Sequence, residues 1–181
     1  MYCDGLFTFQ DKIQILKWTS KKVGKCLFNS DVNNCEKDLC DFSEAVSMCD
    51  NGFLIVIQDL TQNLFGVCVS MRVNAEGMFV KDDDCFVFVM RQFGSVNYEK
   101  YHIKDRMKNF AFFIGRKCDN VVFDAGNGDV TVLKKNRAHM ILCHCGINSF
   151  NYKDRKTTLC CNEYSGVMEI KRYILFKLER K

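Results

Sequence analysis

The stretch from Phe53 to Ser70 reads FLIVIQDLTQNLFGVCVS and contains two apolar runs separated by a polar connector. Phe53 to Ile57 and Leu64 to Val69 are rich in β-branched and aromatic residues, which favour strands. The connector from Gln58 to Asn63 carries turn-forming residues. The pattern predicts two adjacent antiparallel strands joined by a turn.

Similar runs on both sides of this hairpin predict a β-rich α+β domain. CFVFVM, from Cys85 to Met90, is apolar throughout, as expected of a strand buried on both faces. Because the strands follow one another through short connectors instead of alternating with helices, we expect antiparallel layers. The other expected strands cover residues 25–29, 78–80, 97–103, 110–114, 120–123, 129–133 and 168–178.

Two segments are candidates for helices. Asp41 and Glu44 have the spacing of a capping box, in which the first side chain caps the helix and the second reaches back. Apolar residues recur behind them at helical spacing, which predicts a helix that ends near Gly52. Residues 11–22 fit either a short helix or an irregular lead-in. The predicted organisation is a lead-in of residues 1–24 packed on a single domain of residues 25–181.

Length and composition agree with a single core. A chain of 181 residues that is 48% hydrophobic can bury about 70% of its unfolded surface in one domain. The sequence contains no apolar stretch of the roughly 20 residues that span a bilayer. Its first residues lack the basic region followed by an apolar block that is typical of a signal peptide. We therefore expect an intracellular, cytoplasmic protein, in which the twelve cysteines are mostly reduced.

Six segments, in order, resemble the TLDc domain of oxidation-resistance proteins. The hairpin FLIVIQDLTQNLFGVCVS, the strand DDDCFVFVM and the segments NYEKYHI and NFAFFIG are similar to successive family motifs. The stretch NVVFDAGNGDVTVLKKN is similar to the glycine-rich segment of the family, and MEIKRYILFKLE to its closing strand. The resemblance covers about Lys25 to Glu179 and implies a nearly bare TLDc domain. The chain departs from the family in its shortened glycine run and in the missing tryptophans of the later strands.

The resemblance implies two antiparallel sheets packed as a sandwich with one or two flanking helices. It also implies a non-enzymatic role in the oxidative-stress response, by protein binding, with the vacuolar proton-pumping ATPase as partner class. The sequence itself contains no G-x-S-x-G, H-E-x-x-H or P-loop motif, so no enzyme is indicated. By family match, the partner is expected to bind the loops that carry Gly66, Gly115, Gly126 and Gly128.

The cysteines suggest two further kinds of chemistry. Thiolates and imidazoles are zinc ligands, and alternation along an extended segment would place three of them on one face, although the spacing is not that of a standard finger. The candidate zinc ligands are His139, Cys143, Cys145, Cys160 and Cys161. A cationic neighbour makes a thiol reactive by lowering its pKa, which makes Cys26 and Cys118 the candidate redox thiols. Structural burial of most of the thiols, with no cofactor, is the favoured interpretation.

A second functional hypothesis is a DNA-binding regulator tuned by oxidation or metal, which would add the nucleus as a location. Clustered basic residues are what nucleic-acid binding requires, although the net charge of +4 is modest. The candidate contacts are Lys134, Lys135, Arg137, Lys171 and Arg172. Solvated faces and strand edges protected by lysine are the favoured interpretation of such clusters. Gly126-Asn127-Gly128 is interpreted as a hairpin turn in preference to a phosphate-binding loop. Asp82-Asp83-Asp84 is interpreted as a solvated turn in preference to a calcium site.

Overall fold

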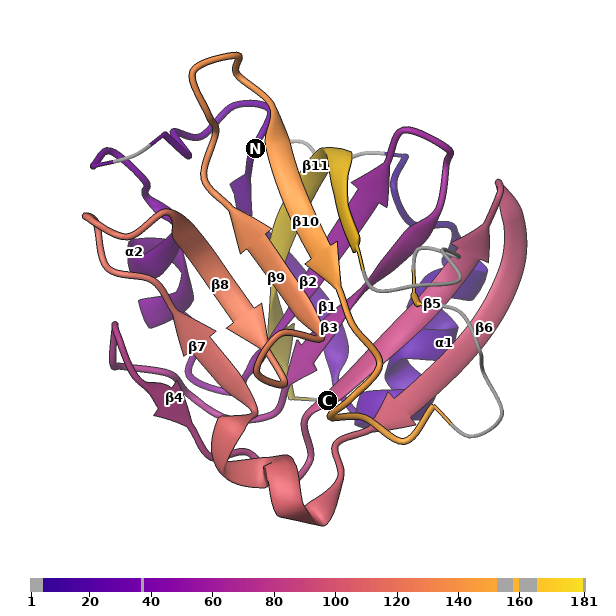
Figure 1. The fold of residues 1–181 in the computed structure, drawn as a ribbon. Helices are drawn as coiled ribbons and strands as arrows, with labels where there is room; N and C mark the ends of the chain where they lie inside the picture. The colour runs from indigo at the N-terminus through magenta and orange to yellow at the C-terminus, as the bar shows by residue number, and fades with distance from the viewer. Residues whose placement is uncertain (1–4, 37, 153–157, 160–165, 181) are drawn as a thin grey trace.

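The protein was analysed as a computed structural model, which describes residues 5–36, 38–152, 158–159 and 166–180. Within these residues, no helix has the length and the apolar character needed to span a bilayer. This described part of the chain contains two α-helices, one 3-10 helix and eleven strands. Figure 1 shows their arrangement. Their bounds are α1 Phe9–Thr19, β1 Lys22–Asn29, α2 Phe42–Ser47, β2 Phe53–Asp59, β3 Leu64–Val69, β4 Phe79–Val80, β5 Phe86–Gln92, β6 Ser95–His102, η1 Asp105–Phe110, β7 Phe112–Ile114, β8 Val121–Ala125, β9 Val130–Leu133, β10 Ile141–Cys145 and β11 Gly166–Glu179.

The strands form one large antiparallel sheet with the order β4-β7-β8-β9-β10-β11-β2-β3-β5-β6. The long strand β11 lies at its centre. Its first part pairs with β10, from Gly166 to Ile170, and its later part pairs with β2, from Ile170 to Lys177. β1 adds to the far end of β11, with Lys22 opposite Glu179. The expected β-rich domain with few helices is therefore confirmed.

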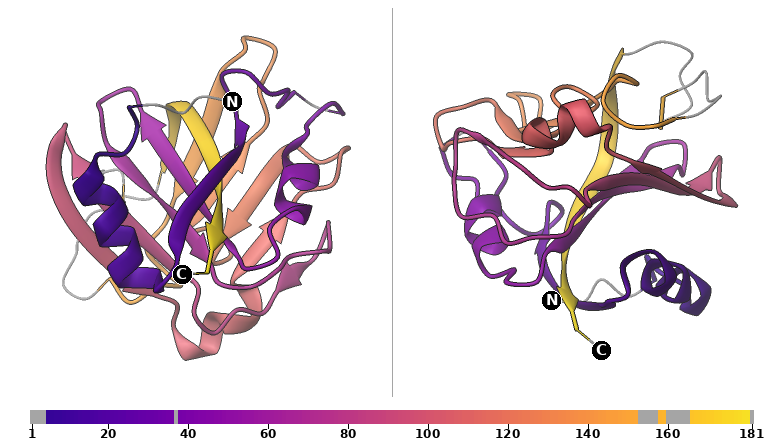
Figure 2. Two further views of the ribbon diagram at one scale, coloured as in Figure 1. Left: turned by 180° about the vertical axis from the view of Figure 1, so that it is seen from behind. Right: turned by 90° about the horizontal axis from the view of Figure 1, so that it is seen from below.

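The sheet bends at β11, so that its two arms face each other. The right view of Figure 2 shows the β7–β10 arm above the β2–β3–β5–β6 arm. Between them lies the main core, where Phe53 of β2 meets Phe112 of β7 with ring centroids 5.3 Å apart. Tyr173 of β11 and Phe123 of β8 also meet there, at 6.1 Å. A division into two separate sheets is not confirmed, because β11 belongs to both arms.

The β2–β3–β5 region is buried on both faces, which explains its uninterrupted apolar sequence. One face contributes to the main core, and the other forms a second apolar cluster beneath α1. Trp18 of α1 packs against Phe86 and Phe88 of β5, with ring centroids 6.2 and 5.9 Å apart. The expectation that CFVFVM is buried on both faces is confirmed, since Phe86 to Met90 are all buried.

The helix starts differ from the prediction. Residues 11–22 do contain a helix, and α1 begins with a capping box in which Thr8 and Asp11 exchange hydrogen bonds. The capping box predicted at Asp41 is wrong: Asp41 precedes α2, but its side chain makes no capping hydrogen bond. Its backbone, at φ −88° and ψ 6°, lacks the extended conformation that aims an N-cap side chain at the first turn. α2 also ends at Ser47, well before Gly52.

Candidate functional site

Four exposed apolar side chains lie at one end of the molecule, on elements far apart in sequence. The β2–β3 turn and the β5–β6 turn are neighbours there, and the start of α1 lies behind them (Figure 1). The Phe93 N–H donates to Asn63 Oδ1 at 2.7 Å, which joins the two turns. Arg91 donates to the Leu6 carbonyl at 3.3 Å, which joins β5 to the segment before α1. We call the following four residues, with their exposed fractions, the hairpin end: Phe9 80%, Leu60 60%, Phe93 67% and Val96 61%.

The β5–β6 turn holds its aromatic residue in a conformation that such residues avoid. Phe93 has φ 48° and Gly94 has φ 78°, so both central residues are left-handed. Asn-Gly or Gly-Gly is the favoured sequence for this geometry, because a bulky side chain is strained at positive φ. An exposed phenylalanine therefore occupies a position that backbone energetics would assign to asparagine. Such strain persists only where the surroundings enforce it, and it is concentrated at functional sites.

A buried polar network beneath the two turns enforces this conformation. The Asp59 carboxylate accepts from the Asn63 backbone N–H at 2.8 Å and from Asn63 Nδ2 at 2.6 Å. It also accepts from the backbone and the hydroxyl of Thr61, at 2.8 and 2.9 Å. The same Asn63 side chain then accepts from Phe93. Because Asp59 and Asn63 are buried, the network holds the β2–β3 and β5–β6 turns in one arrangement.

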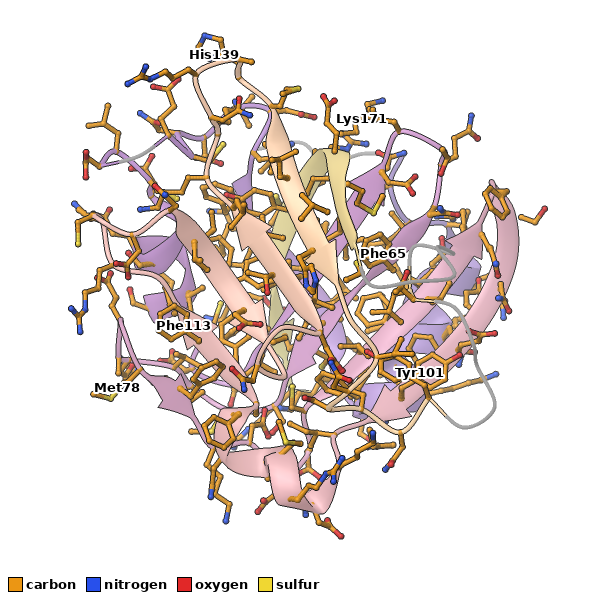
Figure 3. The ribbon with its side chains drawn as sticks, viewed as in Figure 1. Phe65, Met78, Tyr101, Phe113, His139 and Lys171 are labelled. Carbon is orange, nitrogen blue, oxygen red and sulfur yellow. The ribbon has the colours of Figure 1, made fainter. Side chains whose placement is uncertain are left out.

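Exposed charges of both signs lie beside the hairpin end, since Asp31 and Glu169 are exposed as well as the lysines. Lys12 and Lys171 are exposed, and Figure 3 shows Lys171 near the β2–β3 turn, in accord with the pairing of Ile170 with Asp59. Arg172 is half-buried and pairs with Asp31 at 3.2 Å. A cavity of about 340 Å³ lies between the turns, lined among others by Gln58, Gln62, Leu64, Arg91 and Arg172.

Arg91 completes this end through an ion pair with the buried Asp11 of α1. Burial alone would raise the pKa of Asp11, but hydrogen bonds from Thr8 and Tyr98 and the charge of Arg91 hold it below its ordinary value. Burial and the hydrogen bond to Asp11 raise the pKa of Tyr98 to about 12. The carboxylate is thus ionised at neutral pH and anchors α1 to the sheet.

Of the four glycines proposed as partner contacts, Gly66 and Gly115 are close-packed against main-chain oxygens, and Gly126 and Gly128 lie in a turn. Gly66 lies in the middle of β3, so its assignment to a loop is corrected: a Cβ there would lie 1.9 Å from the Ile55 carbonyl oxygen. A Cβ on Gly115 would lie 1.9 Å from the Val121 carbonyl oxygen. Gly126 and Gly128, with φ 71° and 101°, belong to the β8–β9 turn. The interpretation of this segment as a hairpin turn is confirmed, because it joins two paired strands.

The two candidate redox thiols differ in exposure. Cys26 is buried in β1, whereas Cys118 is exposed, with its thiol 3.8 Å from Asp119 Oδ1. The other cysteines of the described residues are buried. Burial raises the pKa of Cys49 to about 11 and that of Cys68 to about 12. These two thiols behave as small apolar side chains at neutral pH.

The candidate zinc ligands within the described residues do not converge. Cys143 and Cys145 share the buried face of β10, with their Sγ atoms 3.9 Å apart. His139 lies at the outer tip of the preceding loop (Figure 3), where its ring is 3.7 Å from Glu36 Oε1. In the part of the chain that the structure describes, no group of three or more suitable side chains could hold a metal ion. Cys160 and Cys161 lie outside the described residues.

The basic residues proposed for DNA contact are largely engaged within the fold. Lys134 is buried, and its ammonium donates to the carbonyls of Arg116 and Lys117 at 2.9 and 2.6 Å. Lys135 donates to the Ser30 carbonyl at 3.3 Å. Arg137 is exposed, and Lys171 and Arg172 lie near the hairpin end instead. Lys135 and Arg172 contact neighbouring residues, Ser30 and Asp31, so each of them is bound within the fold.

The acidic triplet is divided between the interior and the surface. Asp82 is buried and accepts from the Ser70 backbone and hydroxyl at 2.7 and 2.5 Å, whereas Asp83 and Asp84 are exposed. The role of Asp82 is therefore structural, since both of its oxygens already accept hydrogen bonds. Only Asp83 and Asp84 occupy the predicted solvated turn.

A comparison with protein-family models finds no match for this chain, and a comparison with curated protein sequences finds none either. Sequence reasoning did not identify the hairpin end. The available signal was the Phe93-Gly94 pair between two strand segments, where a large apolar residue occupies a turn position that asparagine usually fills.

Proposed function

We propose that the chain is a TLDc-like protein-binding domain of the oxidative-stress response, without enzymatic activity, and that it binds its partner through the hairpin end. The observation that carries the proposal is the exposed, strained and fixed Phe93 between further exposed apolar side chains. Aromatic residues on a preformed surface supply much of the energy of protein interfaces. They also cost little entropy on binding when they are already held in place.

The proposed partner is a protein surface that combines an apolar site with carboxylates. Lys12 and Lys171 are exposed near the hairpin end, the carboxylates of Asp11 and Asp59 there are buried, and the exposed Asp31 carboxylate is paired with Arg172. An acidic rim on the partner would complement the two lysines and favour encounter. Among known partner classes, the resemblance to TLDc domains selects the vacuolar proton-pumping ATPase. In this proposal the two arms of the sheet correspond to the two layers of the TLDc sandwich.

Binding to the purified cytosolic sector of that ATPase tests the proposal. The sector is immobilised, and the dissociation constant of the wild-type protein is compared with that of the double variant Leu60→Ser, Phe93→Ser. Loss of two central apolar contacts is expected to weaken binding by at least about tenfold. The matched control is Met48→Ser, because Met48 is 59% exposed and lies just after α2, away from the hairpin end.

The two parts of the proposal fail in different ways. If the wild-type protein does not bind the ATPase sector, the assigned partner is wrong. If the wild type binds and the double variant binds equally well, the hairpin end is not the interface. A loss of binding by Met48→Ser of the same size would move the interface toward α2. Thermal unfolding of each variant establishes that it is folded under the binding conditions.

A further inference from the structure

A cavity lies between the end of α1 and the outer face of the sheet, separate from the hairpin end. Its volume is about 270 Å³, which corresponds to about nine water molecules at 30 Å³ each. α1 and the residues after it form one wall, and β3, β5 and β6 form the opposite wall. Its main lining residues are Trp18, Lys21, Cys68, Phe86, Lys100 and His102.

Lys100 places an ammonium group in the wall of this cavity. Its Nζ donates to the Trp18 carbonyl at 3.0 Å and lies 4.1 Å from the centroid of the Phe86 ring. An ammonium has three N–H donors, and among the described residues Trp18 takes one, which leaves two to bind a ligand. Burial lowers the pKa of Lys100, and the charge of Asp84 opposes the shift. Geometry therefore favours an anion, since the Nζ atom lines the cavity and keeps N–H donors available to a ligand.

Lys100 and Lys21 bring two ammonium groups to this cavity, and Asp84 brings a carboxylate, while the buried Asp82 carboxylate lies behind the lining residue Ser70. The Lys21 ammonium donates to the carbonyls of Asn51 and Ser70 at 2.6 and 3.1 Å, which leaves one donor. Burial and the charge of Lys100 lower the pKa of His102, so its imidazole is neutral at pH 7. Asp84 is the acidic residue of the lining and is exposed at its rim.

The remaining walls are aromatic and apolar. The Trp18 and Phe86 rings lie edge to face with centroids 6.2 Å apart, and the His102 ring is 6.0 Å from Phe86. Flat rings bind well between such groups, because stacked and edge-to-face contacts add to the burial of apolar surface. Two ammonium groups disfavour a cationic ligand. The cavity therefore combines an anion-binding side with a surface suited to a planar apolar group.

We propose that this cavity binds a small carboxylate whose body is a flat apolar ring, with the carboxylate on Lys100 Nζ and the ring against Trp18 and Phe86. The site is distinct from the proposed protein interface and does not depend on it. It would make the position of α1 on the sheet sensitive to a small molecule, because the ligand contacts both α1 and the sheet. Binding sites between elements with a few convergent polar groups are typical of small ligands.

The chain provides its own reporter, because Trp18 is its single tryptophan and lines the cavity. Benzoate is titrated into the wild-type protein while tryptophan fluorescence is recorded. We expect a saturable change with benzoate and a much weaker one with benzyl alcohol, which keeps the ring and lacks the charge. Benzylamine, which reverses the charge, is expected not to bind. An equal response to all three ligands, or none to benzoate at millimolar concentration, overturns the proposal.

Lys100→Met tests the assigned anchor, because methionine keeps an unbranched side chain and removes the charge. A hydrogen bond to a charged group contributes about 1.5–3 kcal/mol, so the affinity for benzoate should fall about ten- to a hundredfold. Lys17→Met is the matched control, since Lys17 is an exposed lysine of α1 outside the cavity lining. Equal affinity of Lys100→Met and wild type for benzoate would contradict the assignment.

A second variant keeps the test decisive if Lys100→Met does not fold. Lys100→Arg retains the charge and the donors, so its affinity for benzoate should stay within about tenfold of the wild-type affinity. Removal of the charged contact would lower the affinity by more than that. Circular dichroism and thermal unfolding compare the fold of each variant with that of the wild type. If Lys100→Arg is folded and does not bind, Lys100 does not act through its charge and the proposal fails.

Discussion

The replacement Asp129→Ala tests the polar centre of the β8–β10 arm. Asp129 follows the β8–β9 turn and is fully buried. Its carboxylate accepts from the backbone N–H groups of Asn148, Ser149 and Phe150 at 2.8, 2.7 and 3.2 Å. It also accepts from the Tyr152 hydroxyl at 3.1 Å. One side chain therefore fixes the chain that follows β10.

The magnitude follows from the donors that alanine would leave without an acceptor. Ser149, Phe150 and Tyr152 are buried, whereas Asn148 is exposed and can bind water instead. A buried donor that loses its acceptor costs about 1–3 kcal/mol. Water that enters the space left by the carboxylate accepts hydrogen bonds from some of these three donors. We expect Asp129→Ala to lower the free energy of unfolding by about 3–6 kcal/mol, a large part of the roughly 5–15 kcal/mol of a typical domain.

Urea unfolding followed by tryptophan fluorescence measures this loss, and hydrogen exchange locates it. Amide protection should fall first over residues 148–150. Asp105→Ala serves as the control, because the Asp105 side chain is 96% exposed and its ion pair with Lys108 lies on the surface. Such pairs contribute little to stability. If Asp129→Ala lowers the free energy of unfolding by less than about 1 kcal/mol, the reasoning is refuted, because a single hydrogen bond contributes about that much.

Three other outcomes follow from burial and charge. Gly66→Ala should lower the free energy of unfolding in urea by more than about 4 kcal/mol, because the added Cβ would overlap a main-chain oxygen of β2. The control Gly24→Ala should lower it far less, because a Cβ there meets only a flexible side chain. After brief treatment of the native protein with iodoacetamide, peptide mapping should find Cys118 modified and Cys68 unmodified; equal labelling would contradict the burial of Cys68. Asp11→Asn should be less stable than wild type at pH 7. Because the fold lowers the pKa of Asp11, this difference in the free energy of unfolding should persist at pH values above 3.8, the ordinary pKa of the group. It should disappear as the pH falls through the pKa of Asp11 in the folded state. A difference that does not change with pH would refute the prediction.

Local patterns predicted most of the strands, because each apolar run had to be buried whatever its neighbours were. The hairpin of Phe53 to Ser70 forms as expected, with Phe53 opposite Val69. The capping box was predicted in the wrong place, since the spacing of Asp41 and Glu44 does not specify the backbone angle on which capping depends. The true box at Thr8 and Asp11 is held in addition by the ion pair with Arg91, a contact between residues far apart in the chain.

The candidate sites were predicted less well, because they depend on where side chains meet. Alternation correctly placed Cys143 and Cys145 on one face, but His139 precedes the strand with φ 58°, which breaks the alternation. Lys134 and Lys135 form a basic run in the sequence, yet their ammonium groups bind carbonyls of other loops.

The sequence by itself determined that the chain forms an antiparallel, β-rich domain, because periodicity and turn chemistry are local properties. Only the tertiary structure decided that β11 joins both arms into one sheet, and that Leu60 and Phe93 lie on neighbouring turns. Only the packing of α1 on the sheet created the cavity around Lys100. The physical reason is that strand order and side-chain convergence depend on contacts between distant residues, which no local pattern encodes.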